Sequence, residues 1–194
     1  ISHTYYKQMD NFKATKLHTE ILKAISEMGF ETPTPIQAKT IPHLMSSNQD
    51  LIATAQTGTG KTAAFGLPSI HLTNIKYNDT QTLVLCPTRE LCIQIAKDLA
   101  KYSKYLNGIN ILAVYGGSDI RAQIKSLNKG AHIVIGTPGR TKDLIKRKKL
   151  NIGHIARIIL DEADEMLTMG FKEDLEMILS HTPKEKQTLL FSAT

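Results

Sequence analysis

The fold follows from residues 55–62, Ala55-Gln56-Thr57-Gly58-Thr59-Gly60-Lys61-Thr62. This octapeptide comes after a short apolar run, residues 51–55, and precedes a segment containing alanine, phenylalanine and leucine that can open a helix. A strand, a glycine-bearing turn and Gly-Lys-Thr at a helix start have the geometry of a phosphate-binding loop, in which backbone N–H groups and the helix N-terminus hold a polyphosphate. We therefore predict a nucleotide site in which Lys61 reaches the β- and γ-phosphates and the Thr62 hydroxyl ligates Mg²⁺. The alternative is a turn without a ligand, and Ala55 stands where the strict pattern has glycine.

The composition is that of an ordinary globular domain. The chain has 194 residues, of which 41% are hydrophobic and 22% charged, enough to bury one core. No apolar run approaches the roughly 20 residues that a membrane span needs, and residues 1–7 lack the hydrophobic centre of a signal peptide. These features predict a cytoplasmic protein with no membrane association.

Lysine and arginine outnumber the acids by 24 to 18, which gives a net charge of +6. This excess favours a polyanionic partner. The dense basic run at residues 146–149 is interpreted as a solvated helix end rather than a dedicated binding patch. Cys86 and Cys92 are the only cysteines, and they are predicted to be buried free thiols rather than a disulfide or metal pair.

Short apolar strands alternate with amphipathic helices along the whole chain. Such strands indicate an α/β fold with a mostly parallel β-sheet that is covered by helices on both faces. Ligands of these folds bind beyond the C-terminal ends of the strands. The expected strands are residues 51–55, 82–86, 111–115, 133–136, 158–161 and 189–192, and the expected helices are residues 17–28, 89–105, 120–128, 140–146 and 173–179. A further helix is expected to have Pro35 in its first turn.

A second acidic site lies about 100 residues after the phosphate-binding loop. Residues 157–160 form an apolar strand that ends in Asp161, Glu162, Ala163 and Asp164. Asp161 can meet the Mg²⁺ held by Thr62, and Glu162 can position or deprotonate a water that attacks the γ-phosphate. An acidic helix N-terminus is the alternative explanation, but the upstream loop makes nucleotide hydrolysis the better one.

Asp161-Glu162-Ala163-Asp164 spells the signature of the DEAD-box ATP-dependent RNA helicases, and the chain resembles this family in motif order as well. The similarity covers about residue 12 to the last residue and is closest to the bacterial cold-shock type. The matching segments are Phe12 with residues 29–30 and 33–37 (Q motif), 55–62 (motif I), 87–91 (motif Ia), 116–117 (GG motif), 137–140 (motif Ib), 161–164 (motif II) and 192–194 (motif III).

The resemblance implies a RecA-like domain that binds ATP and Mg²⁺. Gln37 would pair with the adenine edge through its amide, and Phe12 would stack on the ring. Lys61, Asp161 and Glu162 would be the catalytic residues. Residues 1–37 would form an N-terminal extension with the Q motif, and residues 38–194 the first RecA-like domain.

The same resemblance implies an RNA site that grips the sugar-phosphate backbone without reading its sequence. Glycine lets backbone approach phosphate closely, and arginine supplies a fork of donors. The implied RNA-binding residues are Pro87, Thr88, Arg89, Gly116, Gly117, Thr137, Gly139 and Arg140. Asp164, Ser192 and Thr194 would couple the ATP and RNA sites through hydrogen bonds.

Three departures and two alternatives remain at this point. Thr141 stands where the family usually has an apolar residue, Cys92 replaces a common alanine, and the family's second RecA-like domain, which supplies an arginine finger, is absent from these residues. A nucleotide-gated RNA clamp would carry the same motifs as a helicase. A GTPase would need Asn-Lys-x-Asp, whereas Asn128-Lys129-Gly130-Ala131 lacks the aspartate.

Overall fold

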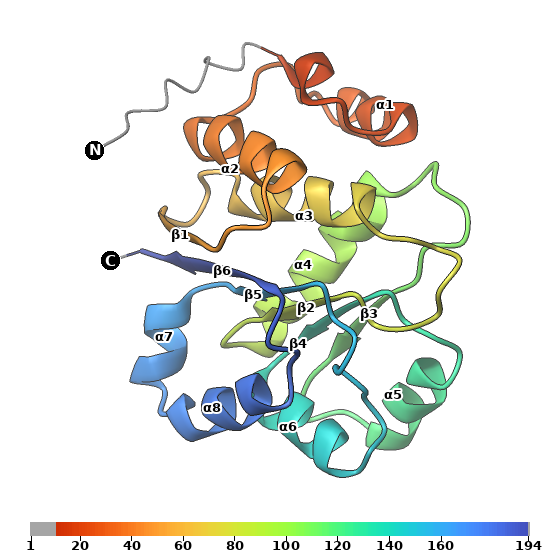
Figure 1. Ribbon diagram of the computed structural model, residues 1–194, viewed down its shortest axis with the longest axis vertical. Helices are drawn as coiled ribbons and strands as arrows, with labels where there is room; N and C mark the ends of the chain where they lie inside the picture. The colour runs from red at the N-terminus through yellow and green to blue at the C-terminus, as the bar shows by residue number, and fades with distance from the viewer. Residues whose placement is uncertain (1–10, 194) are drawn as a thin grey trace.

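The computed structural model describes residues 11–193 as one layer of parallel strands between two layers of helices (Figure 1). Each strand is followed by a helix that returns the chain across a face of the sheet, except the last. The elements are η1 (Phe12–Thr15), α1 (Thr19–Glu27), α2 (Pro35–Ser46), β1 (Leu51–Thr54), α3 (Lys61–His71), β2 (Thr82–Leu85), α4 (Arg89–Tyr102), β3 (Ile111–Val114), α5 (Ile120–Leu127), β4 (Ile133–Gly136), α6 (Pro138–Lys146), β5 (Arg157–Leu160), α7 (Ala163–Thr168), α8 (Lys172–Ser180) and β6 (Gln187–Ser192).

The six strands are all parallel, in the order β1-β6-β5-β2-β4-β3. All residues of β2, β4 and β5 are buried, as expected for parallel strands that are covered on both faces. The expected α/β fold with a mostly parallel sheet is therefore confirmed. At the edge of the sheet, Ile52 of β1 is 80% exposed.

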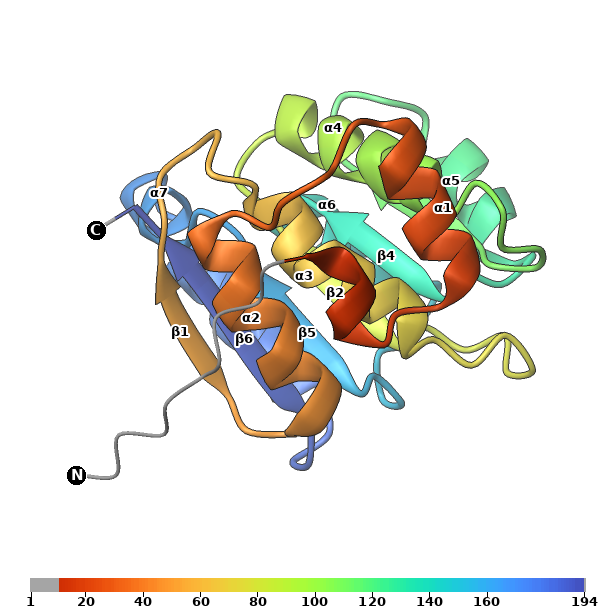
Figure 2. The same ribbon diagram turned by 90° about the horizontal axis from the view of Figure 1, so that it is seen from above.

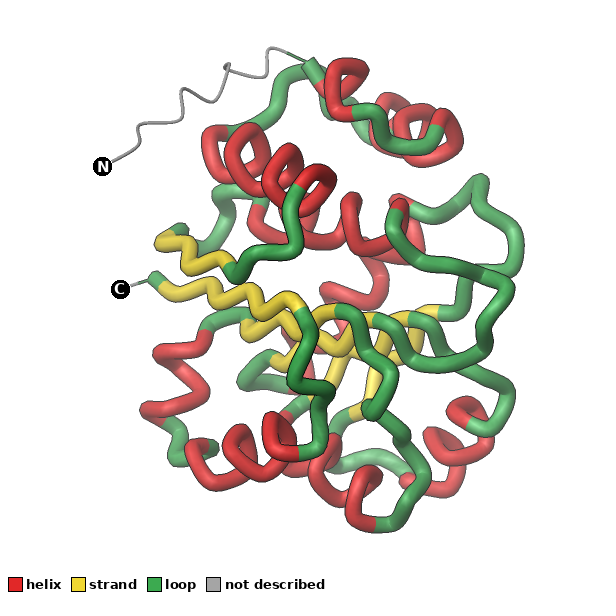
Figure 3. The backbone as a smooth tube through the Cα atoms, in the orientation of Figure 1, coloured by secondary structure: helices red, strands yellow, loops and turns green. Residues whose placement is uncertain are grey.

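Helices α2 to α4 lie on one face of the sheet, with α1 packed outside them against α4, and α5 to α8 cover the other, with the strands as a middle layer in the tube view (Figures 1, 2 and 3). Each face has its own buried core. The first contains Phe65, Leu67 and Phe191, and the second contains Val134, Leu144 and Ile158. The N-terminal segment belongs to the first core through Phe12, Leu17, Ile21 and Ile25.

The predicted elements agree with the structure to within a few residues. Pro35 is the first residue of α2, as expected, because a residue there needs no hydrogen-bonded N–H. Helix α2 runs through the proposed boundary at residues 37 and 38, so that division remains a prediction about motifs. Cys86 and Cys92 are buried free thiols, as predicted. Among residues 11–193, no helix is both long and apolar enough to cross a bilayer.

Strand order separates the two predicted sites along one edge of the sheet. The phosphate-binding loop follows β1, Ser192 is the last residue of β6, and Asp161 follows β5, and these three strands are neighbours. The implied RNA-binding segments follow β2, β4 and β3, which make up the other half. Because the strands are parallel, their C-terminal ends share one edge, so the nucleotide half adjoins the RNA half between β5 and β2.

Candidate nucleotide and RNA site

The phosphate-binding loop connects β1 to α3 and contains two glycines with left-handed backbone. Gly58 has φ 79° and Gly60, the residue before α3, has φ 88°. Residues with a side chain are strained at such positive φ values, whereas glycine is not. The Thr59 hydroxyl donates to the Gln56 carbonyl oxygen over 2.6 Å, and the Ala55 N–H donates to the Ser192 carbonyl oxygen over 2.9 Å. Gln56 and Thr57 are exposed. The loop is thus tied to its own turn and to β6.

Lys61 and Asp161 form a buried ion pair at the centre of the nucleotide half. The Lys61 ammonium lies 3.3 Å from an Asp161 carboxylate oxygen, with side-chain exposures of 6% and 3%. Burial raises the pKa of Asp161, and the Lys61 charge opposes that rise. Neither Lys61 Nζ nor this oxygen has a hydrogen-bond partner of good geometry in the described part of the chain. A buried charge pair with spare hydrogen-bonding capacity is suited to receive a charged ligand.

Glu162 follows Asp161 in a backbone conformation that is rare outside glycine. Its φ is 54° and its ψ 51°, immediately before α7. Such strain costs about 1–3 kcal/mol and is concentrated at functional sites. Burial and the neighbouring Asp161 raise the pKa of Glu162. A half-buried carboxylate with a raised pKa is suited to act as a base near neutral pH.

The donors present fit Mg²⁺. This ion is usually held by one or two carboxylates, by substrate phosphates and by water rather than by an all-protein cage. Thr62 is half-buried in the first turn of α3, two chain positions after Gly60, and Asp161 offers a buried oxygen without a hydrogen-bond donor. Thr62 and Asp161 as Mg²⁺ ligands remain a prediction.

Gln37 contacts the phosphate-binding loop directly. Its Oε1 accepts from the Thr34 N–H over 3.0 Å, in a capping box at the start of α2. Its Nε2 donates to the Gly60 carbonyl oxygen over 3.2 Å. A Cβ at residue 60 would lie 2.4 Å from that nitrogen. The left-handed backbone therefore favours glycine at this position, and a larger residue would also displace the Gln37 amide.

Beside this loop lies a groove of about 380 Å³. It is lined by Pro35, Ile36 and Lys39 of α2 together with Thr54, Ala55, Gln56 and Thr59. Ile36 belongs to the predicted Q motif, whereas sequence reasoning did not single out Lys39, although its position two residues after Gln37 on α2 could have suggested it.

Phe12 lies in the first core. The residue is 5% exposed, and its ring centroid is 6.0 Å from that of Phe30. In this arrangement the ring packs under α1 and α2 rather than facing solvent. Its predicted stacking on adenine remains a prediction.

The RNA half presents Arg89 and a glycine turn to solvent. Thr88 precedes α4 and its hydroxyl accepts from the Leu91 N–H over 3.2 Å, whereas Pro87 is buried. The exposed Arg89 guanidinium stacks over the Tyr115 ring at 5.1 Å. Gly116 and Gly117 are exposed, and a Cβ at residue 117 would lie 3.7 Å from Arg89. This turn leaves open backbone beside an arginine, which is suited to phosphate.

Arg140 is engaged with protein groups. Its guanidinium donates to Gln123 Oε1 over 2.9 Å and to the Ser118 carbonyl oxygen over 3.1 Å. Gln123, 8% exposed, in turn donates to the Tyr115 carbonyl oxygen and the Ser118 hydroxyl. Arg140 therefore holds the 115–118 turn against α5 and α6. The motif comparison did not identify Gln123, which holds this turn.

Comparison with known proteins decides the family. The model of the DEAD/DEAH box helicase family matches residues 34–194. The chain belongs to this family. It is 54% identical over 186 residues to the DEAD-box ATP-dependent RNA helicase CshA of Geobacillus kaustophilus, and 55% identical over 186 residues to the ATP-dependent RNA helicase CshA of Listeria monocytogenes. These alignments cover 96% of this chain but only 39% and 35% of the two relatives.

A solved DEAD box protein from the hyperthermophile Methanococcus jannaschii has the same fold. The TM-score is 0.90 at 47% identity, over 95% of this chain and 50% of that one. The predicted resemblance to the DEAD-box helicases, including the bacterial cold-shock type, and the RecA-like fold are confirmed.

In this DEAD-box domain, a side chain of motif II contacts a backbone group of motif III. The Ala193 N–H donates to Asp164 Oδ2 over 3.2 Å. Ser192 is buried next to this contact in the chain. Ser192 and Asp164 each have a further interaction with the protein. Thr194 lies outside the described residues. The coupling role of Asp164, Ser192 and Thr194 remains a prediction, to which the structure adds the Ala193 N–H.

Two other motif positions complete the DEAD-box site. Thr137 is half-buried, and its N–H donates to the Val114 carbonyl oxygen over 3.1 Å. A Cβ at Gly139 would lie 3.7 Å from Asp174 of α8. Thr137 and Gly139 thus start α6 beside the 115–118 turn.

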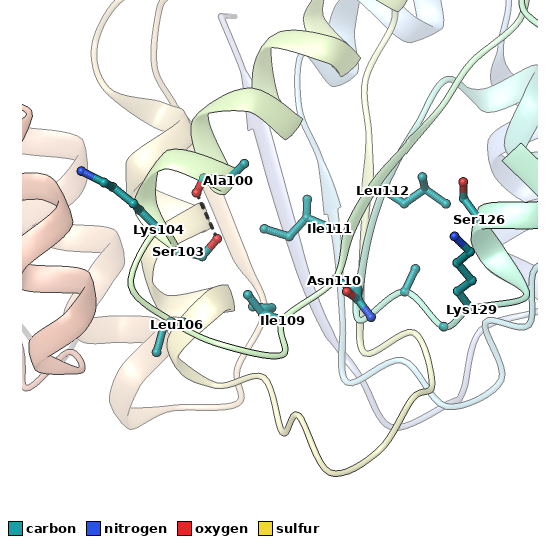
Figure 4. A pocket seen from close by; sticks show the side chains of 12 residues that line it. Ala100, Ser103, Lys104, Leu106, Ile109, Asn110, Ile111, Leu112, Ser126 and Lys129 are labelled. Atoms are coloured by element: carbon teal, nitrogen blue, oxygen red, sulfur yellow. Dashed lines mark hydrogen bonds between the residues drawn. The ribbon is translucent and has the colours of Figure 1, made fainter. Parts of the chain in front are cut away.

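A groove of about 470 Å³ lies elsewhere, beside β3, and contains no motif residue (Figure 4). Lys129 and Gly130 line it, between the end of α5 and the start of β4. The Asn128–Ala131 sequence weighed for guanine recognition is therefore at the edge where strands begin, opposite the phosphate-binding loop. This position argues against a GTPase.

Proposed function

We propose that this chain binds ATP with Mg²⁺, contacts the RNA backbone and, when joined to a second RecA-like domain, couples ATP hydrolysis to local unwinding of RNA duplexes. The single observation that carries the proposal is the strand order. It sets the phosphate-binding loop and motif II after β1 and β5, and the motif Ia, Ib and GG segments after β2, β4 and β3 at the same edge. The names of the CshA relatives, ATP-dependent RNA helicases, support it.

Each residue of the nucleotide half has a distinct part in the proposed reaction. Lys61 would leave Asp161 to neutralise the β- and γ-phosphates, while the loop N–H groups hold their oxygens. Bound Mg²⁺, held by Thr62 and Asp161, would supply further positive charge on the phosphates. Glu162 would orient the attacking water and accept its proton. Gln37 would select adenine.

RNA would lie across the other half of the edge. Arg89 and the exposed Gly116–Gly117 backbone would contact phosphates directly, whereas Arg140 would position the turn that carries those glycines. The motif II–motif III contact between Asp164 and Ala193 would transmit the state of the nucleotide to this half. Two buried free thiols suit the cytoplasmic location that we propose for the protein.

The decisive experiment is ATPase activity with and without RNA, measured on the longer parent chain. We expect RNA to stimulate hydrolysis, Arg89→Ala to reduce that stimulation, and Glu162→Gln to abolish turnover. An ATPase rate that is the same with and without RNA would contradict the proposal. The number of ATP molecules hydrolysed per duplex separated distinguishes a helicase from an RNA clamp that uses hydrolysis only to reset binding.

A further inference from the structure

A basic cluster, Lys146, Arg147, Lys148 and Lys149, lies at the C-terminal end of α6, and all four residues are exposed. Arg147 is paired with Asp143 over 2.7 Å. The three lysines form no ion pair within residues 11–193. Positive charge in the last helical turn stabilises the helix dipole, which accounts for Lys146. It does not require two further lysines beyond the helix.

Lys148 occupies a backbone position that favours glycine. Its φ is 55°, and the Lys148 and Lys149 N–H groups donate to the carbonyl oxygens of Ile145 and Leu144 over 2.8 and 2.9 Å. This pattern closes the helix as a left-handed C-terminal cap, for which glycine is the usual residue. A lysine here strains the backbone. Because its side chain makes no ion pair that offsets the strain, the local fold does not explain the lysine.

Lys148 also forms one wall of a groove of about 340 Å³. Asn151 and His181 contribute polar groups to the same groove, and Ile145 and Ile152 contribute apolar surface. A groove with cationic and hydrogen-bonding walls over an apolar floor can receive a phosphate together with its sugar.

Helix α6 connects this cluster to the proposed RNA half. The helix begins at Pro138, next to Thr137 of motif Ib, and ends at Lys146. Its nine residues span roughly 13 Å, at 1.5 Å per residue. An RNA strand that leaves the edge beside motif Ib and follows α6 would therefore meet the cluster within a few nucleotides.

We propose that Lys146, Lys148 and Lys149 bind phosphates of RNA that extends beyond the motif Ia, GG and Ib face. This inference rests on the proposed function, because it assumes that RNA lies beside motif Ib. It goes beyond the sequence-based interpretation of residues 146–149 as a solvated helix end, with which their exposure agrees. Such a site would bind RNA by its charge and not by its sequence, since every contact would be to the RNA sugar-phosphate backbone.

The test compares two single-stranded RNAs on this chain by fluorescence anisotropy across a salt series. One is short enough to cover only the motif face, and the other extends it by about eight nucleotides, within the range that one binding groove accommodates. The variants are Lys146→Gln/Lys148→Gln/Lys149→Gln and a control, Lys97→Gln/Lys125→Gln/Lys129→Gln, which removes the same charge from exposed lysines of α4, of α5 and of the turn after α5.

We expect the cluster variant to bind the long RNA about tenfold more weakly, with a salt slope smaller by about 2, since each single-strand phosphate contact contributes about 0.7. The short RNA should bind the cluster variant as tightly as it binds the unchanged chain. Lys148→Gly should weaken long RNA as well, and because it relieves strain, misfolding cannot explain its loss. Unchanged long-RNA affinity in the cluster variant overturns the proposal, as does an equal loss in the control. Equal binding of polyglutamate by the cluster would make it an acidic-protein site and overturn the RNA assignment.

The failure of the proposed function is separable from this outcome. Arg89→Ala tests the motif face through the short RNA alone. The cluster is tested by the difference between long and short RNA, so the two results are read independently.

Discussion

The side-chain amide of Gln37 donates a hydrogen bond to the carbonyl oxygen of Gly60 over 3.2 Å. This bond joins α2 to the phosphate-binding loop, while the other end of the same amide caps α2 at Thr34. The Gln37 NH2 group has two N–H donors, so one can hold Gly60 while the other pairs with adenine. Adenine recognition and the conformation of the phosphate-binding loop therefore depend on the same amide group.

Gln37→Ala is expected to weaken ATP and ADP binding by about 1–3 kcal/mol, because the adenine edge loses its partner. It should also lower stability, since the cap at Thr34 is lost. Gln37→Glu is the matched control: glutamate keeps the capping acceptor but not the donor, so it should lose nucleotide affinity while keeping most of the stability. Calorimetry with ADP and thermal melting measure the two effects. If GTP competes with ATP equally on the unchanged chain, Gln37 does not select adenine.

Apolar strands that alternate with amphipathic helices predicted the layers of the fold from sequence, because such runs are local signals. Motif spacing proposed the site residues, whose roles remain predictions. It could not predict that β6 lies between β1 and β5, or that Arg140 is bound by Gln123 and Ser118. Both depend on packing between segments far apart in the chain. Gln123 carries no local signal, since a glutamine on an amphipathic helix is ordinarily exposed.

Glu162→Gln is expected to retain ATP and RNA binding in the parent protein and to lose turnover, because an amide cannot accept the proton. Since the pKa of Glu162 is raised, hydrolysis by the unchanged protein should fall with decreasing pH already above the ordinary glutamate range.

A raised folded-state pKa means that ionisation of Glu162 costs stability as the pH rises. Glu162→Gln should therefore be the more stable protein at neutral pH, with a difference that shrinks on acidification. Melting curves and kcat across pH measure both; RNA-stimulated turnover in the variant would remove Glu162 from the mechanism.

Thr141→Val is expected to raise the free energy of unfolding by about 1 kcal/mol, because the variant removes a buried hydroxyl that has no hydrogen-bond partner. Thr141 is fully buried, and its hydroxyl oxygen lies 2.1 Å from where a Cβ of Gly136 would stand. Gly136→Ala is the opposing control and should destabilise by about 1–3 kcal/mol through overpacking. Urea denaturation distinguishes them, and a destabilised Thr141→Val would mean that the hydroxyl is satisfied in solution.

Lys148→Gly is expected to stabilise the domain by about 1 kcal/mol, because glycine adopts the left-handed conformation without strain. Lys149→Gly is the matched control. Lys149 is not among the residues with positive φ, so glycine there adds only chain entropy to the unfolded state and should destabilise. Equal effects of the two substitutions on the denaturation midpoint would contradict a strained Lys148.

The last prediction concerns what these residues do without a second domain. The proposed RNA face is one side of a cleft, with Arg89 and Gly116–Gly117 exposed to solvent. A few exposed phosphate contacts give weak binding that salt reverses steeply. On the nucleotide side, Lys61 and Glu162 are present, but the family resemblance assigns the arginine finger to the second domain, and such a finger contributes about 10³–10⁵ in rate.

This chain should therefore bind adenine nucleotide, hydrolyse it slowly and fail to separate strands. Joining the parent's second domain through its own linker should restore RNA-stimulated hydrolysis and unwinding together. A strand-displacement assay on both proteins measures this, with Glu162→Gln in the two-domain protein as the control for ATP dependence. Efficient unwinding by the single domain would show that the open half-cleft is sufficient and would refute the prediction.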